Sequence, residues 1–134
     1  MENKNQIPTN YVKVGRITMP IAREAHVKAG DIYINNNHLK HIADNHNQEL
    51  LNLGLTAWNF VNVIINSYTR IYKDTKTGAY YLAVYADEYT NAAVIELNFV
   101  ENFEFWEIKT AAPFRTAFFK NKLLVWKKGA NPLK

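Results

Sequence analysis

The chain has 134 residues and a mass of 15.5 kDa, which fits one domain with a single core. Apolar residues make up 48% of the chain and charged residues 21%, and these values argue against a disordered, coiled-coil or collagen-like protein. Because no cysteine is present, disulfides, thiolate metal sites, iron–sulfur clusters and a cysteine nucleophile are excluded.

The net charge of +4 is unevenly distributed along the chain. Residues 108–134 contain seven cations and no acid, whereas the first 107 residues contain nine cations and all twelve acids, a net charge of −3. The seven cations are Lys109, Arg115, Lys120, Lys122, Lys127, Lys128 and Lys134. One end of the domain therefore carries a cationic strip, which permits a polyanionic partner.

The first thirty residues show no clear periodicity, and we expect a loose N-terminal arm over residues 1–30 with one short element between Ile17 and Lys28. A single domain is expected over residues 31–128 and a short basic tail over residues 129–134. The start of the chain is polar, and no apolar run approaches the ~20 residues that a membrane helix needs. We therefore expect a cytoplasmic protein without a membrane partner.

Two helices are predicted after a short strand over residues 31–34. The triple asparagine at 35–37 supplies a helix N-cap, and apolar residues at spacings of three and four predict a helix over residues 38–53 that ends at Gly54. A second helix over residues 56–66 begins with Thr56 as its cap and should bury Trp58, Val61 and Ile65.

Strand-forming residues dominate from residue 69 onward. Strands are predicted over residues 69–73, 79–86, 92–99 and 103–109, and Asp74–Gly78 forms a hairpin loop between the first two. Residues 116–126 fit a strand or a helix, and their apolar residues favour the strand. The predicted fold class is α+β, with two N-terminal helices packed on an antiparallel meander of four or five strands.

Three of the four histidines, His38, His41 and His46, lie within nine residues of the first predicted helix. On an ideal helix His46 lies in the middle of the apolar stripe, His38 at its edge, and His41 about 140° from His46. The three side chains cannot reach one ligand there, and the spacing lacks the pattern of a zinc site, so no metal or other cofactor is expected. The simplest interpretation makes His46 a hydrogen-bonded core residue and leaves His38 and His41 solvated.

Cations on the predicted sheet are the second group of candidates. Arg70, Lys73 and Arg115 could present positive charge to phosphate. The lysines of the cationic strip solubilise the surface unless nucleic acid binds there. If it does, Lys73, Lys109, Lys120 and Lys122 are the expected contacts.

Two segments of the chain resemble the phage-associated nucleases of the Barnase–EndoU–Colicin–RelE (BECR) group. Residues 32–42 followed by His46 are similar to that family's opening strand, loop and Leu-x-His-Ile-x-x-x-His motif. Residues 106–115 and 120–126 resemble its final hairpin, with Thr110 before the loop. The resemblance covers residues 32–128.

The resemblance implies a metal-independent endoribonuclease of phage and toxin contexts, with helices on a four-stranded antiparallel sheet. In this chemistry a ribose 2′-hydroxyl attacks its own 3′-phosphate and leaves a cyclic phosphate, which requires a base, an acid and a cation. His41, His46 and Thr110 match the family motifs, and His41 is expected to act if only one histidine does. We add Arg70 and Arg115 from the sequence as phosphate stabilisers.

The same resemblance implies RNA as the partner, with tRNA as one candidate, and an antitoxin or immunity protein as an inhibitor. The alternative is a non-catalytic RNA- or protein-binding domain of the same fold, favoured by the absence of an acid and base on one helix face. A third interpretation is an adaptor domain of a mobile element that neither binds nor cleaves RNA.

Overall fold

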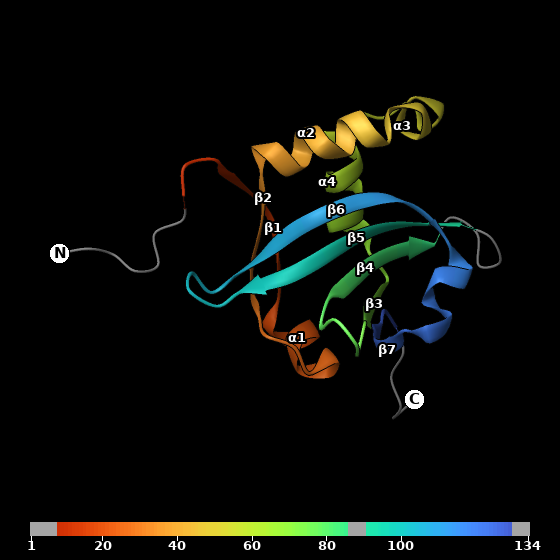
Figure 1. Ribbon diagram of the computed structural model, residues 1–134. Helices are drawn as coiled ribbons and strands as arrows, with labels where there is room; N and C mark the ends of the chain where they lie inside the picture. Colours follow the sequence, from red (N-terminus) through yellow and green to blue (C-terminus); the bar gives the residue numbers. More distant parts are fainter. Residues whose placement is uncertain (1–7, 86–90, 130–134) are drawn as a thin grey trace.

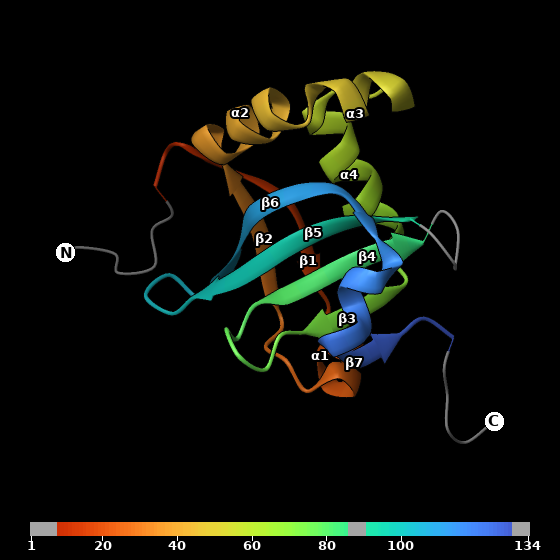
Figure 2. The ribbon, with the colours of Figure 1, turned by 45° about the vertical axis from the view of Figure 1, so that its right-hand side comes forward.

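The computed structural model describes residues 8–85 and 91–129, which form one seven-stranded sheet with helices on both faces (Figures 1 and 2). The strands are β1 (Tyr11–Ile17), β2 (Gly30–Asn35), β3 (Arg70–Lys73), β4 (Tyr80–Tyr85), β5 (Asn91–Val100), β6 (Phe105–Arg115) and β7 (Leu123–Lys127). Their order in the sheet is β1-β2-β6-β5-β4-β3-β7. Strands β2 and β6 are parallel, and the other neighbours are antiparallel.

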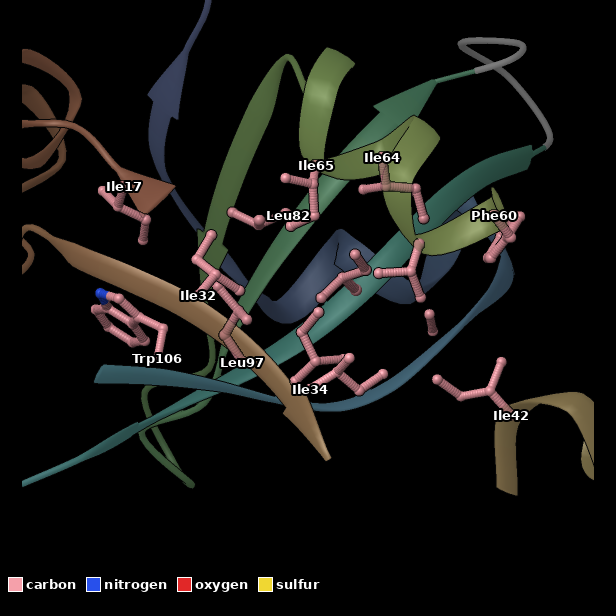
Figure 3. Close-up of a cluster of buried hydrophobic side chains, with 14 of the residues drawn as sticks. Ile17, Ile32, Ile34, Ile42, Phe60, Ile64, Ile65, Leu82, Leu97 and Trp106 are labelled. Carbon is pink, nitrogen blue, oxygen red and sulfur yellow. The ribbon is translucent and has the colours of Figure 1, made fainter. Parts of the chain in front are cut away.

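The helices are α1 (Met19–Ala25), α2 (Asn36–Asn45), α3 (Asn47–Leu53), α4 (Ala57–Ser67) and a 3-10 helix, η1 (Thr116–Asn121). The main core lies between α2–α4 and one face of the sheet, where Ile42, Phe60 and Ile64 meet Ile34 and Leu97 (Figure 3). Because side chains alternate along a strand, the opposite face is lined by a different set of residues. That face holds a smaller aromatic cluster under η1.

The predicted α+β class is confirmed, and β3, β4, β5 and β6 are consecutive neighbours as in the predicted meander. The layout of two helices on an antiparallel meander is wrong, because β1 and β2 extend the sheet beyond β6 and β7 extends it beyond β3. The short element expected between Ile17 and Lys28 is confirmed as α1, but the rest of the expected loose arm is wrong, because Tyr11–Ile17 form β1; Ile17 and Ala22 are buried in the core. The apolar pattern of β1 is weak because most of this edge strand is exposed or only half-buried.

The helix predicted over residues 38–53 is broken at His46. The His46 backbone lies outside the helical region, at φ −123° and ψ 22°, although its N–H still donates to the Ile42 carbonyl. Three successive residues of low helix propensity, Asn45, His46 and Asn47, explain the break. The change of direction at His46 places Leu50 in the core and leaves Leu53 exposed.

The second predicted helix is confirmed as α4, and the Thr56 side chain accepts a hydrogen bond from the Asn59 N–H as expected for its cap. Val61 and Ile65 are buried, but Trp58 is 39% exposed and the prediction for it is wrong. The reason is that α4 packs between the sheet and α2, and Phe60 rather than Trp58 lies on the side that faces them.

The hairpin at residues 74–78 is confirmed. Lys73 pairs with Tyr80, the Asp74 carboxylate accepts from the Lys76 and Thr77 N–H groups, and Gly78 has φ 80°. The segment 116–126 is split into η1 and β7, so neither a single strand nor a single helix describes it.

The tail expected at residues 129–134 lies, apart from Gly129, outside the described residues. None of the helices in the described part of the chain combines the length and apolar character that a bilayer-crossing segment requires.

Candidate functional site

A buried carboxylate, Glu107, lies on β6 near the point where β2 runs into α2. It is 8% exposed and is the only charged side chain in the buried class among residues 8–85 and 91–129. Its neighbours in the register are Tyr33 on β2 and Asn98 on β5. Because Trp106 and Ile108 point into the main core, Glu107 points to the opposite face. Burying a charge is costly unless it is paired, so its partners define the site.

Two donors hold one oxygen of this carboxylate. The Tyr11 hydroxyl donates to Glu107 Oε2 at 2.6 Å, and the Asn35 side-chain amide donates to the same oxygen at 3.2 Å. Tyr11 and Asn35 are partners in the β1–β2 register, so the edge strand carries one donor and the strand beside it the other. Burial raises the pKa of the Tyr11 hydroxyl, and the hydrogen bond to Glu107 raises it further. Tyr11 therefore remains a protonated donor at neutral pH.

His38 joins this cluster from the first turn of α2. The Asn35 side chain caps the helix by accepting from the His38 backbone N–H at 2.7 Å, which fixes the position of His38. Its Nδ1 lies 2.9 Å from the Ile108 carbonyl oxygen and 3.7 Å from Glu107 Oε2. A carbonyl oxygen only accepts, so Nδ1 carries a proton. Proton exchange is then left to Nε2, which has no hydrogen-bond partner among the described residues, and the side chain is 27% exposed.

Lys109 brings a positive charge to the second carboxylate oxygen. Its Nζ lies 3.7 Å from Glu107 Oε1, and its side chain is 41% exposed. The register places Leu97 opposite Ile108 and Glu96 opposite Thr110, so Lys109 is the extra residue of a β-bulge. Bulges redirect side chains and often occur beside active sites. A carboxylate oxygen, an imidazole and an ammonium group thus meet at one surface position.

Three aromatic rings pack beside the Glu107 carboxylate. Phe105 is buried two residues before Glu107, and Tyr11 and Tyr33 contact its ring edge-on with centroid distances of 5.2 and 5.1 Å. Such T-shaped pairs are the favoured aromatic geometry. They fix the Tyr11 ring, and through its hydroxyl they fix the orientation of Glu107.

The histidines predicted from the sequence lie elsewhere. His41 is exposed on α2 and its Nε2 lies 2.7 Å from the Asn45 side-chain nitrogen, whereas His46 sits at the α2–α3 junction with Nδ1 2.8 Å from Glu49 Oε1. Each is therefore paired within its own local turn. His46 is hydrogen-bonded as expected, but it is only half-buried and does not lie in the core. The interpretation of His38 as a solvated residue is wrong, because its ring is held by β6. The signal for it was present in the sequence, since the capping asparagine three residues earlier places His38 at the helix start.

The other predicted catalytic residues are spread along the sheet. Thr110 follows the bulge on β6 and is half-buried opposite Glu96. Arg115 is exposed at the end of β6. Arg70 lies on β3, from which β6 is separated by β4 and β5, and it donates to the Tyr72 hydroxyl at 3.3 Å. The structure therefore places only Thr110 beside the Glu107 cluster.

The four lysines expected to bind nucleic acid lie in four different surroundings. Lys109 belongs to the Glu107 cluster, and Lys73 lies 5.6 Å from the centre of the Tyr80 ring. Lys120 is exposed on η1. Lys122 pairs with Asp74 at 3.6 Å and lies over the Phe118 ring. Two of the cations of the acid-free end are therefore paired with acids from the first 107 residues, Lys109 with Glu107 and Lys122 with Asp74.

The described residues contain no group of three or more histidine, aspartate or glutamate side chains arranged to hold a metal ion. Comparison of the chain with protein-family models, with curated proteins and with solved structures gives no match. The functional assignment below therefore depends on the geometry of the Glu107 cluster and on the chemistry that this geometry supports.

Proposed function

We propose that this protein is an endoribonuclease that cleaves RNA by attack of a ribose 2′-hydroxyl on the adjacent phosphate, without a metal ion. The observation that carries the proposal is the meeting of Glu107, His38 and Lys109 at one surface position. The reaction needs a base for the 2′-hydroxyl, an acid for the leaving oxygen and positive charge for the phosphorane. The three groups supply these functions in the same order.

The hydrogen bonds of the cluster assign the roles. Tyr11 and Asn35 occupy Glu107 Oε2, so Oε1 is the oxygen left to take the proton from the 2′-hydroxyl. The 2′-oxygen then attacks phosphorus, and the 5′-oxygen leaves with a proton from Nε2 of a protonated His38, while Lys109 stabilises the negative charge. The products are a 2′,3′-cyclic phosphate and a 5′-hydroxyl. Glu107 ends protonated and His38 neutral, and water restores both.

The test is incubation of the purified full chain with RNA in the presence of EDTA. We expect fragments that end in a 2′,3′-cyclic phosphate, and no cleavage of a strand whose 2′-hydroxyls are all methylated. Glu107→Gln keeps the size of the side chain and its acceptor oxygen but removes the base, and should lower the rate by about 10²- to 10⁴-fold. An unchanged rate in Glu107→Gln, or intact RNA after incubation with the wild type, would overturn the proposal.

A second candidate is a non-catalytic RNA-binding domain. It is favoured by the burial of Glu107, whose bonds to Tyr11 and Asn35 also tie the edge strand β1 to β6. In that case Glu107→Gln changes only the free energy of unfolding, and RNA binds with a strong salt dependence but yields no products. A toxin role in a phage context, with tRNA as the target and an antitoxin or immunity protein as the inhibitor, is proposed on the sequence resemblance alone.

A further inference from the structure

A groove runs beside the C-terminal end of α1, on the face of the sheet opposite to Glu107. Its larger part is a cleft of about 770 Å³ lined by His26, Lys28, Tyr80, Phe99 and Trp106, among others. A second hollow of about 360 Å³ shares His26 and Tyr80 with it and continues toward β7. Figure 2 shows the elements that line it, which are the C-terminal end of α1 and the turns that join β3 to β4 and β5 to β6.

The aromatic rings of the groove are held in place before any ligand arrives. Tyr80 and Phe99 are half-buried and contact the Trp106 ring edge-on, with centroid distances of 5.4 and 5.0 Å. Trp106 is buried as the floor between them, and its Nε1 donates to the Lys28 carbonyl at 3.0 Å. Rings fixed in this way lose little freedom when a planar group stacks on them.

Each partly exposed ring has a lysine beside it. Lys28 Nζ lies 4.6 Å from the centre of the Phe99 ring, and Lys73 Nζ lies 5.6 Å from the centre of the Tyr80 ring. Lys28 also pairs with Glu101 at 3.0 Å, but both side chains are highly exposed and such a pair contributes little. Lys73 forms no ion pair within the part of the chain that the structure describes.

We propose that this groove binds single-stranded RNA, with bases stacked on Tyr80 and Phe99 and phosphates held by Lys28 and Lys73. Aromatic platforms interleaved with cations along a groove are the general solution for unpaired nucleic acid. The choice of RNA rests on the proposed function, because a strand cleaved at the Glu107 cluster would need a second surface for nucleotides farther from the cleaved bond.

An extended peptide is the competing occupant, because Leu123 and Leu124 are exposed along the second hollow. RNA is favoured by the chemistry of the walls. Three basic side chains, His26, Lys28 and Lys73, face one acid, Glu101, across the two hollows. The pairing of each partly exposed ring with a lysine suits a base and its phosphate better than it suits a peptide.

Binding is measured by fluorescence anisotropy with a labelled 2′-O-methyl RNA strand of about 12 nucleotides, which cannot be cleaved by 2′-hydroxyl attack. Tyr80→Leu should raise the Kd by about fivefold or more, and Lys73→Gln should reduce the slope of log K against log salt by about 0.7. Trp58→Leu and Lys40→Gln are matched controls, because both residues are exposed on helices outside the groove. We expect the controls to bind like the wild type.

Because Tyr80 also packs against the core, its substitution is paired with the surface double variant Lys28→Gln/Lys73→Gln, which does not remove core contacts. Wild-type Kd and salt slope in that double variant would overturn the proposal. Binding of an extended peptide at the groove without measurable affinity for the RNA strand would overturn it as well.

Cleavage assays separate this inference from the proposed function. Groove variants should cut a dinucleotide at the wild-type rate and lose kcat/KM only on the longer strand, whereas Glu107→Gln should fail on both while binding 2′-O-methyl RNA normally. If no RNA is cleaved but the groove variants still weaken binding, the proposed function is wrong and the groove assignment stands. If RNA is cleaved and the groove variants bind the 2′-O-methyl RNA with the wild-type Kd, the groove assignment is wrong.

Discussion

Two polar clusters lie on the same face of the sheet, and they differ in how many of their polar groups are hydrogen-bonded within the cluster. The first is the Glu107 cluster described above. The second joins Arg70, Tyr72 and Tyr85, where the two tyrosine hydroxyls lie 2.7 Å apart and the Arg70 guanidinium lies 3.9 Å from the centre of the Tyr85 ring. Tyr72 also stacks on Phe119 at 4.1 Å under η1. In the second cluster the polar groups bond to one another, whereas the first cluster leaves a histidine nitrogen and a lysine ammonium at the surface.

The two clusters also differ in their ability to exchange protons near neutral pH. Burial raises the pKa of Tyr85 to about 12, and its hydrogen bond with Tyr72 adds to the rise. Tyr85 therefore stays neutral at physiological pH and cannot serve as a base. In the Glu107 cluster His38 keeps Nε2 open to substrate, and a histidine is the usual proton carrier near neutral pH. We therefore expect substitutions in the Glu107 cluster to lower the cleavage rate and substitutions in the Arg70–Tyr72–Tyr85 cluster to change only the free energy of unfolding.

The largest expected effect is that of His38→Ala. It removes the proposed acid while leaving the Asn35 cap, because the Asn35 side chain accepts from the His38 backbone N–H and not from the His38 ring. The rate of RNA cleavage should fall by about 10²- to 10⁴-fold. His41→Ala is the matched control on the same helix and should keep the wild-type rate. Equal losses in the two variants, measured at matched helix content by circular dichroism, would contradict the assignment of His38.

Next in size is the effect of Lys109→Gln, which removes the cation proposed to stabilise the phosphorane. The loss of one such group typically costs about 10²-fold in kcat, and this loss should appear in single-turnover cleavage at saturating enzyme. Lys120→Gln removes one exposed cation from η1 and should change only the affinity at low salt. If both variants lost affinity but kept the rate, Lys109 would be a binding residue only.

A third pair of variants compares the clusters through stability. Tyr11→Phe removes the donor to a buried charged carboxylate and should lower the free energy of unfolding by about 1.5–3 kcal/mol. Tyr72→Phe removes a bond between neutral hydroxyls and should cost about 1 kcal/mol. Urea unfolding measures both. Cleavage should decrease in Tyr11→Phe, because Glu107 loses its orientation, and should remain unchanged in Tyr72→Phe.

The parts of the fold that the sequence predicts are those with local causes. The Thr56 cap, the apolar face of α4 with Val61 and Ile65, and the hairpin at residues 74–78 all depend on residues within a few positions of one another. The edge positions of β1 and β7 and the parallel pairing of β2 with β6 depend on contacts between distant segments. Single-chain periodicity carries no information on such pairings, so they could not be predicted.

The candidate site was missed for the same reason. Tyr11 and Glu107 are 96 positions apart and His38 is 70 positions from the Ile108 carbonyl. A glutamate on a strand is normally predicted to face solvent. Glu107 is buried because β1 and the start of α2 pack beside it. His41 and His46 attracted attention because they match a motif, but the break at His46 gives each a local partner instead.

The smallest expected effect concerns Asp74, in the turn beside the structural cluster. The Lys76 and Thr77 backbone N–H groups and the Lys122 ammonium lower the pKa of Asp74 below its ordinary value of 3.8. A carboxyl with a lowered folded pKa stabilises the fold above the unfolded pKa and loses this contribution as the pH falls through the folded pKa. Asp74→Asn keeps the acceptor oxygen and removes the charge. It should therefore be less stable than the wild type at neutral pH, with a difference that closes as the pH falls below 3.8.

Urea unfolding at several pH values measures this difference, and cleavage should stay at the wild-type rate throughout. A gap between Asp74→Asn and the wild type that stays constant to low pH would show that the charge of Asp74 contributes nothing. A loss of cleavage in Asp74→Asn would instead extend the chemical region to the η1 side of the sheet, and the division between the two clusters would fail.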